Sequence, residues 1–401
     1  MIAPGVLDMR KPIVLVSLAA LAACSGGGPQ SPGGTPVIGG GSTTHSFIAP
    51  TEKKTYSAIG GVQRYTYSTD DRNVGQYNQL YAGNASTARN SGITVSYDPR
   101  DAIFEVTISD SLAANASDNI RFQDPAHRTD FGGAIEPQDG TPQITGAGQD
   151  VHYLEVGSGE GPLRYDLSIS DTFPVGDNGA SRDHSTFFYE KPGTTTKYVT
   201  YAGFVRNATS ITEVENPDGS KYLRQDNQLE RAAFVFGERT DNNAVPRTGT
   251  ATFTGDMVAS MVYNPLFDNG VTDTYFQWID GSATTNVDFG ANSFSTSLTG
   301  TVRAPQYDAY TSRINVLNAG ATFAASGSGT IDLVNKGGFS GQVTSASFNQ
   351  GGNIPVNIAG SSIDGAFFGP AANEVGGGFR IVGGTPDERI DILGAFTGVK
   401  P

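Results

Sequence analysis

In several segments between Thr248 and the C-terminus, small or aromatic apolar residues alternate with polar residues at every second position. In TGTATFTGDMVAS (248–260) the alternating apolar set is Ala251, Phe253, Gly255, Met257 and Ala259. A two-residue period is typical of β-strands, because successive side chains point to opposite faces of a sheet. Similar segments follow at 287–302, 337–348 and 388–400 without a helical segment between them. The sequence therefore predicts a series of antiparallel strands.

Glycine is frequent within these segments, and the chain has 52 glycines among 401 residues, about twice the usual share. Glycine relieves crowding where strands coil and bend, and closure of a sheet removes its exposed edges. We therefore expect residues 246–401 to form an antiparallel β-barrel, with about eight strands and an interior filled by side chains. An open sandwich is the structural alternative.

The preceding part of the chain, residues 47–245, also has the pattern of strands and turns. The segments 92–111 and 184–207 are predicted hairpins that turn at Asp-Pro-Arg-Asp and Lys-Pro-Gly, and a further turn is expected at Asn216–Gly219. Strands are also predicted at VHYLEV and LRYDLSI between the two hairpins. This part is expected to be one β-rich domain with long loops, so the fold class is all-β.

The N-terminus has the features of an export signal with an anchor. Arg10 and Lys11 precede an apolar run of about a dozen residues, which is shorter than the roughly 20 needed to cross a bilayer and fits a signal-peptide core. The only cysteine, Cys24, follows LAA, and Leu-Ala-Ala-Cys resembles the bacterial lipobox, in which the cysteine is lipidated.

Residues 1–23 are accordingly predicted to be a lipoprotein signal peptide, with Met9 as an alternative start. Residues 24–46 comprise the lipidated Cys24 and a tether rich in Gly, Pro and Ser. Ser25, by analogy with enteric lipoproteins, favours sorting to the outer membrane. The alternative is an ordinary buried cysteine after a signal peptide. A single cysteine excludes an intramolecular disulfide.

The segment GAFFGPAANEVGGGF (365–379) could be mistaken for a phosphate-binding loop. It lacks the lysine and the fixed glycine spacing that such loops need. We interpret it as a strand, one helical turn that begins at Pro370 and stops at Gly376, and a second strand. It is a structural connection.

Five motifs in a fixed order resemble the C-terminal β-barrel of the transferrin-binding protein B family. They are TGTATFTGDM, VDFGANSFSTSLTG, FSGQVTSASF, GAFFGPAANEVGGGF and the closing ILGAFTGVK. The resemblance covers roughly residues 246–401. It implies that residues 47–245 are the β-rich handle domain that precedes each barrel in that family of Gram-negative surface lipoproteins. Transferrin receptors of this type have two handle-and-barrel lobes, whereas this chain has room for one.

The resemblance implies a non-enzymatic binding protein, lipid-anchored in the outer membrane and displayed on the cell surface. The expected partners are an extracellular iron- or haem-carrying protein, or haem, and an outer-membrane transporter. A surface lipoprotein for shielding, adhesion or scaffolding is the alternative function. An envelope enzyme is a third class, and it would need a polar pocket inside the barrel.

No residues are predicted to be catalytic or to hold a metal. Cofactor-binding residues are not identified, and haem ligation by one of the histidines is an alternative that the sequence leaves open. The four histidines, His45, His127, His152 and His184, are scattered without zinc-ligand spacing. SRDHS (181–185) places Ser, Asp and His together in sequence, but triads are assembled from separate segments. The aspartates of DDRNVG and NPDGSK lack the spacing of a calcium loop and are interpreted as turn residues. The net charge of −14 makes nucleic acid a poor partner.

The sequence context also sets expectations for two further side chains, those of Glu374 and Trp278. Glu374 is expected to accept backbone N–H bonds near its own short turn. The only tryptophan, Trp278, is predicted to lie in the core if its segment is a strand, and to anchor a partner if the segment is a loop tip.

Overall fold

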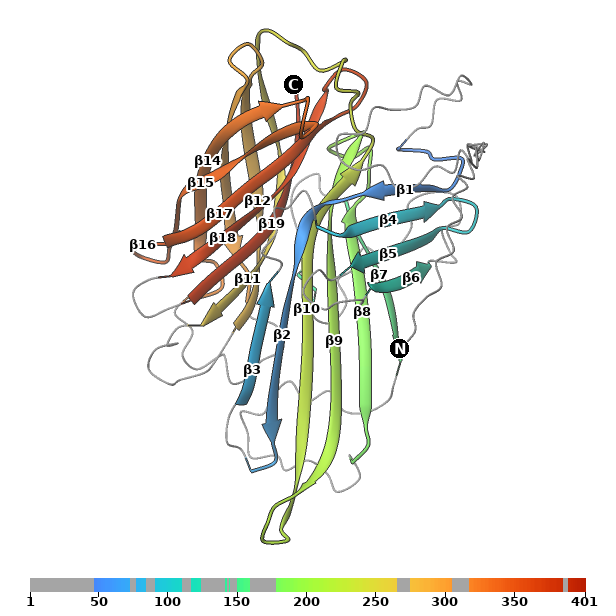
Figure 1. Cartoon of the computed structure of the whole chain (residues 1–401), viewed down its shortest axis with the longest axis vertical. Coiled ribbons are helices and arrows are strands. Elements are labelled where there is room, and N and C mark those ends of the chain that lie inside the picture. Colours follow the sequence, from blue (N-terminus) through green and yellow to red (C-terminus); the bar gives the residue numbers. More distant parts are fainter. Residues whose placement is uncertain are drawn as a thin grey trace, which may run out of the picture.

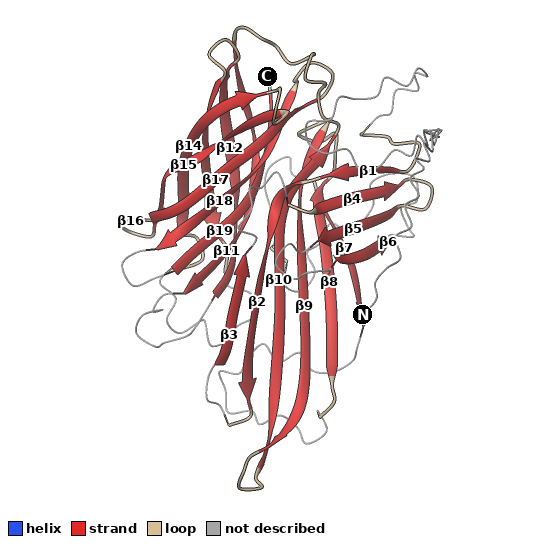
Figure 2. Ribbon diagram, in the orientation of Figure 1, coloured by secondary structure: helices blue, strands red, loops and turns tan. Residues whose placement is uncertain are grey.

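The computed structural model describes residues 47–72, 77–83, 91–109, 117–123, 141–142, 144, 150–158, 178–264, 275–304, 317–384 and 389–401. Within these ranges the chain is all-β and contains no helix (Figures 1 and 2). Consequently no helix there is long and apolar enough to cross a membrane. Cys24, the signal peptide, the tether, His45 and His127 lie outside the described residues, as does the strand predicted at 163–169.

The first ten strands form two sheets, which together are called the handle here (Figure 1). A four-stranded sheet has the order β1-β4-β5-β6, with bounds Lys54–Ser57, Ile93–Asp98, Ile103–Ser109 and Ser117–Gln123. A six-stranded sheet has the order β3-β2-β10-β9-β8-β7, with bounds Tyr77–Gly83, Ile59–Asp70, Lys221–Gly237, Val199–Glu215, Ser181–Glu190 and Val151–Ser158.

The four-stranded sheet packs on one face of the six-stranded sheet (Figure 2). Their shared core is largely aromatic, and Phe104 of β5 lies 5.2 Å from Phe187 of β8 between ring centroids. The predicted hairpins are confirmed: β4 and β5 turn at 99–102, β8 and β9 are joined by 191–198, and β9 and β10 turn at Asn216–Gly219. The strand order joins β2 to β10, far apart in sequence, which local pattern could not predict.

The remaining strands form the barrel. Its bounds are β11 Thr250–Asn264, β12 Tyr275–Asp288, β13 Ser293–Val302, β14 Thr322–Asp332, β15 Gly338–Asn349, β17 Asn357–Phe368, β18 Glu374–Gly384 and β19 Arg389–Val399. The order β14-β13-β12-β11-β19-β18-β17-β15 is closed by pairing between β14 and β15, and the short β16, Asn353–Pro355, is added beside β15. The predicted eight-stranded antiparallel barrel is confirmed.

The barrel interior is filled as its alternating pattern predicted. Phe253, Met257 and Ala259 of β11 point into one apolar core with residues of all the other barrel strands. The buried hydroxyls of Thr285 and Thr296 pair with each other inside it at 3.1 Å. The interior is therefore a packed core lined mainly by apolar side chains.

Glycine serves this core by accommodating aromatic rings on neighbouring strands. Gly365 of β17 pairs with Phe339 of β15, and a Cβ atom at Gly365 would lie only 2.1 Å from Phe339 Cζ. Gly394 of β19 stands in the same relation to Phe379 of β18, with 2.3 Å to Cζ. The rings lie across the glycines, so these positions exclude any side chain.

The prediction of a helical turn within 365–379 is wrong. Strand β17 runs to Phe368, which pairs with Glu374 at the start of β18, and a tight loop of residues 369–373 joins them. Gly369 and Ala372 both have positive φ, at 83° and 54°, which a helical turn does not allow. Gly376 lies within β18 and does not stop a helix. Strand pairing outweighs the local helix preference of Pro-Ala-Ala.

Candidate functional site: the seam between handle and barrel

The free face of the six-stranded handle sheet packs against the outer wall of the barrel, and this contact is called the seam. Its apolar part joins Tyr201 and Val235 of the handle to Val258 and Phe368 of the barrel. A second apolar group, further along the same strands, includes Tyr65, Leu229, Val262 and Phe276. The two assemblies thus share a buried core.

Trp278 lies in this seam. It is on β12, only 2% exposed, and meets Phe188 of β8 edge-on with ring centroids 5.3 Å apart. The prediction that Trp278 is a core residue if its segment is a strand is confirmed. Edge-to-face pairing of this kind adds about 0.5–1.5 kcal/mol beyond the area buried.

Glu374 joins the barrel to the handle through backbone hydrogen bonds. Its side chain points outward from β18, is 1% exposed, and accepts three consecutive backbone N–H groups of the handle. Lys197 N donates to Oε1 at 2.6 Å, while Tyr198 N and Val199 N donate to Oε2 at 2.8 and 3.1 Å. Convergent backbone N–H groups are a recurring way to hold an anion.

Burial raises the pKa of the Glu374 carboxyl, and the three N–H donors counter part of that rise. The expectation that Glu374 accepts backbone N–H bonds is correct, but their source is not its own turn. The donors lie about 175 residues earlier in the chain. No sequence signal marks them, because every residue except proline carries such a donor.

The loop that precedes Glu374 is also held by the handle. Thr240 N donates to Phe367 O and Gly369 N donates to Glu238 O, each at 2.9 Å. The Thr240 hydroxyl donates to Gly369 O at 2.6 Å. A Cβ atom at Gly369 would lie 2.6 Å from the ring of Tyr198, so this ring rests against the loop. The motif 365–379 is therefore one of the barrel's contacts with the handle.

A buried charged group reinforces the middle of the seam. Arg380 of β18 pairs with Asp391 of β19 through Nη2 and Oδ2 at 2.8 Å, and Asp391 is 0% exposed. Gln63 of handle strand β2 donates from Nε2 to Asp391 O at 2.9 Å. The handle strand thus contacts the backbone of a residue whose carboxylate is already neutralised within the barrel.

A second buried carboxyl, Glu190, lies at the end of β8 on the side facing the barrel. The residue is 1% exposed, and its Oε1 accepts a hydrogen bond from the Thr195 hydroxyl at 2.7 Å. Its Oε2 has no hydrogen-bond partner. Burial raises the pKa of Glu190 to about 8, and the nearby Asp256 and Asp150 carboxylates act in the same direction.

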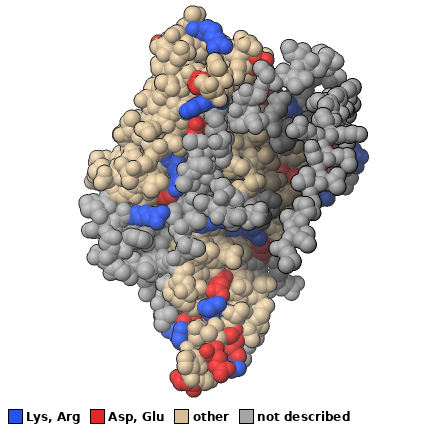
Figure 3. Space-filling model, viewed as in Figure 1, with Lys and Arg blue, Asp and Glu red and all other residues tan. Residues whose placement is uncertain are grey.

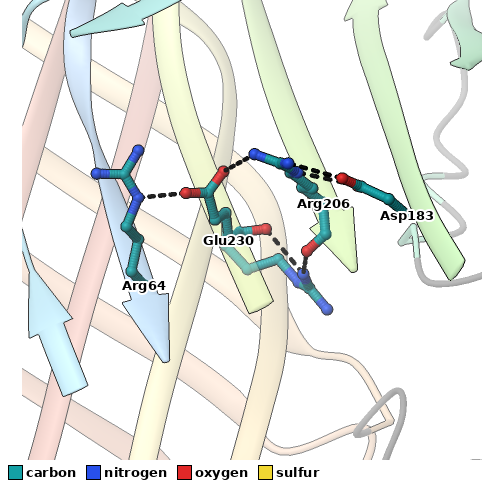
Figure 4. Close-up of polar contacts among 5 residues, drawn as sticks. Arg64, Asp183, Arg206 and Glu230 are labelled. Carbon is teal, nitrogen blue, oxygen red and sulfur yellow. Dashed lines mark hydrogen bonds and ion pairs between the residues drawn. The ribbon is translucent and has the colours of Figure 1, made fainter. Parts of the chain in front are cut away.

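The opposite face of the six-stranded sheet carries a row of alternating charges beyond the aromatic core (Figure 4). Arg64 of β2 pairs with Glu230 of β10, whose Oε2 is 3.9 Å from Arg206 Nη1 on β9. Arg206 in turn binds Asp183 of β8 with Nη2 and Oδ2 2.6 Å apart. Two cations and two anions are matched across four strands, which stabilises the sheet and leaves no net charge for an anionic ligand.

The histidines and aspartates weighed in the sequence are separate in the fold. His152 Nε2 lies 3.1 Å from Asp150 Oδ1, and His184 Nδ1 lies 3.0 Å from Glu155 Oε1. Asp183 binds Arg206, so the residues of SRDHS take part in cross-strand pairs. Within the described ranges no group of three or more His, Cys, Asp or Glu side chains could hold a metal.

The other acidic segments behave as turns where they are described. Asp218 accepts from Ser220 N at 2.9 Å in the β9–β10 turn, and Asp70 pairs with Arg72. In the part of the chain that is described, the exposed large hydrophobic side chains are Ile48, Val156 and Val334, on three different elements. Figure 3 shows acidic and basic side chains interspersed over the face in view.

The comparisons with known proteins agree with this architecture. Residues 245–400 match the family model described as "C-lobe and N-lobe beta barrels of Tf-binding protein B". No curated protein matches the chain. That family is one of non-enzymatic binding proteins.

Solved structures of transferrin-binding protein B are similar at low identity. A variant from Haemophilus parasuis is 12% identical with a TM-score of 0.28, covering 88% of this chain and 76% of that one. Intact Ap-TbpB, with N and C lobes, is 14% identical with a TM-score of 0.27, covering 88% and 80%. The isotype 1 protein of Neisseria meningitidis is 13% identical with a TM-score of 0.23, covering 88% and 77%. Scores this low carry no functional argument. Residues 245–400, which the family model matches, thus span the closed barrel.

Proposed function

We propose that the chain is a lipid-anchored surface lipoprotein of a Gram-negative bacterium that binds an iron- or haem-carrying protein, or haem, and delivers it to an outer-membrane transporter. The observation that carries this proposal is the family match over 245–400, which coincides with the closed barrel. The barrel offers a rigid support, and binding requires no chemistry from its side chains.

The position of the first described residues indicates how an anchored molecule would be oriented relative to the membrane. Phe47 packs edge-on against Tyr56 and Phe236, with ring centroids 5.4 and 5.8 Å apart. Phe236 is next to the end of β10, where Glu238 contacts the 369–373 loop of the barrel. The tether predicted before residue 47 therefore joins the molecule at the end where the barrel has its tight loops. A flexible tether of about twenty residues spans roughly 25 Å.

The longer connections of the barrel are at the opposite end. They follow β11, β13 and β15, whereas the connections after β12, β14 and β17 are only a few residues long. The handle sheet extends the same way, since β2 and β10 pass from Phe368 at the tight-loop end to Val262 and Phe276 further along (Figure 1). We assign ligand capture to this end, which an anchor near residue 47 would direct away from the membrane.

Two experiments test the proposal. Protease treatment of intact cells should digest the protein, whereas protection until the outer membrane is ruptured would place it facing the periplasm and count against a surface receptor. The chain without residues 1–24 should then capture transferrin, haemoglobin or haem from solution. Failure to bind any of these, with the protein shown to be folded by circular dichroism, would favour the alternative below.

The alternative is a surface lipoprotein that shields, adheres or scaffolds without a soluble ligand. The scattered exposed hydrophobic side chains of the described surface, Ile48, Val156 and Val334, are compatible with it, because a receptor would be expected to show an aromatic patch at its loop ends. An envelope enzyme is less well supported, because the described barrel interior is mainly apolar. Its polar groups include the Thr285–Thr296 pair and Gln277, whose Nε2 donates to the Leu317 carbonyl.

A further inference from the structure

Glu190 is a carboxyl group that the seam buries without a counter-charge. It lies on the barrel-facing side of β8, two residues after Phe188, which packs on Trp278. The side chains that influence it come from each neighbouring element: Thr195 from the loop to β9, Tyr201 from β9, Asp256 from β11 and Asp150 from before β7. Apart from neutral Thr195 and Tyr201, these groups are carboxylates.

Arg303, a basic residue of the seam, is already engaged by a carboxylate of the barrel. Arg303 binds Asp280 of β12 with Nη2 and Oδ2 2.5 Å apart, and both lie beside Tyr153 rather than Glu190. Tyr201 is fully buried, and its hydroxyl has no hydrogen-bond partner. An ionised carboxylate with one hydroxyl donor and carboxylate neighbours is strongly disfavoured in such a site. The neutral acid is the form that this packing accommodates.

We propose that Glu190 is a proton-dependent latch, whose neutral acid form keeps handle and barrel packed around Trp278 and whose ionised form loosens that part of the seam. An ionised Glu190 would gain hydration if the handle moved away from the barrel beside Asp256, and repulsion by the Asp256 carboxylate acts in the same direction. The hydrogen bonds of Glu374 to Lys197, Tyr198 and Val199 hold the far end of the segment that carries Thr195, so they limit how far the seam opens. The change is therefore local, and it does not depend on the identity of any ligand.

The fluorescence of Trp278 tests this, because Trp278 is the only tryptophan and packs against Phe188, two residues before Glu190 on β8. With the purified chain lacking residues 1–24, we expect the emission to shift to longer wavelength, and acrylamide quenching to increase, as pH rises from 6.5 to 9. The midpoint should lie near 8. Glu190→Gln, a permanently neutral isostere, should keep the low-pH signal throughout. Glu215→Gln, at an exposed carboxyl of the β9–β10 hairpin, is the matched control and should behave like the wild type.

A second variant keeps Glu190 in place. Asp256→Asn removes a neighbouring negative charge, so it should move the midpoint to lower pH. A wild-type signal that stays flat over this range would overturn the proposal, as would an unchanged transition in Glu190→Gln. If Glu190→Gln does not fold, an unchanged midpoint in Asp256→Asn decides against it.

Discussion

Removal of the Glu374 carboxylate should destabilise the protein more than removal of a carboxylate that only caps its own hairpin turn, such as Asp288 or Asp218. Glu374→Ala leaves three N–H groups, those of Lys197, Tyr198 and Val199, without this acceptor. Each unsatisfied buried donor costs about 1–3 kcal/mol, which gives about 3–9 kcal/mol for three. We expect a loss in the lower part of that range, about 3–6 kcal/mol, because the bonds from Lys197 and Tyr198 are only partly buried and water can replace their acceptor. This is a large fraction of the roughly 5–15 kcal/mol by which a domain is usually stable.

Glu374→Gln removes the charge of the side chain and keeps its shape. The amide keeps one acceptor oxygen but presents an NH2 group to the remaining donors, so we expect an intermediate loss of about 2–3 kcal/mol. The matched control is Asp288→Asn, because Asp288 accepts Ala291 N within its own exposed hairpin at 2.9 Å. That substitution should cost less than about 1 kcal/mol.

The assay is urea denaturation, followed by Trp278 fluorescence for the seam and by circular dichroism for the sheets. Separation of the two curves in Glu374→Ala would show handle and barrel unfolding independently. A loss below about 1 kcal/mol would refute the reasoning, because the three donors would then have found water or another acceptor without cost.

Three further outcomes are expected. The pKa of Glu190 is raised from 4.5 to about 8 in the folded protein, so the free energy of unfolding should fall as pH rises from about 4.5 to 8. The fall should be at most about 5 kcal/mol, and urea denaturation of Glu190→Gln should not show it. Gly365→Ala places a Cβ atom against the Phe339 ring and should cost about 1–3 kcal/mol in thermal denaturation, whereas Gly360→Ala in open space on the same strand should be nearly neutral. Cys24→Ser should move the protein from the membrane fraction to the soluble fraction of cells; retention in the membrane would exclude lipidation at Cys24 as the anchor.

The barrel could be predicted because its strands are marked by patterns within short stretches of sequence. Alternation in 248–260 and 287–302 marks the strands, and the recurrent Gly and Phe mark their inward faces. The same local information failed at 369–373, where Pro-Ala-Ala favours a helical turn. There the pairing of Phe368 with Glu374 fixes a tight loop with positive φ at Ala372. Tertiary pairing overrode propensity.

The seam could not be predicted, because its partners are distant and chemically ordinary. Glu374 was singled out as an acceptor of N–H bonds, but its donors are the backbone of 197–199. Glu190 was not singled out, because a lone glutamate at the end of a strand has no distinguishing pattern. Only the fold shows that the barrel covers it. The anchor at Cys24 was inferred from sequence alone and stays a prediction.

The order of strand pairing has a consequence for how the chain folds. Strand β2 pairs with β10 at Ile59 and Val235, and the barrel closes only when β19 pairs with β11 at Met257 and Phe396. Pairings between such distant segments carry a large entropic cost of loop closure, so they form slowly. A chain that emerges from its N-terminus therefore exposes unpaired strand edges until β19 is available, so this protein should depend on chaperones during folding.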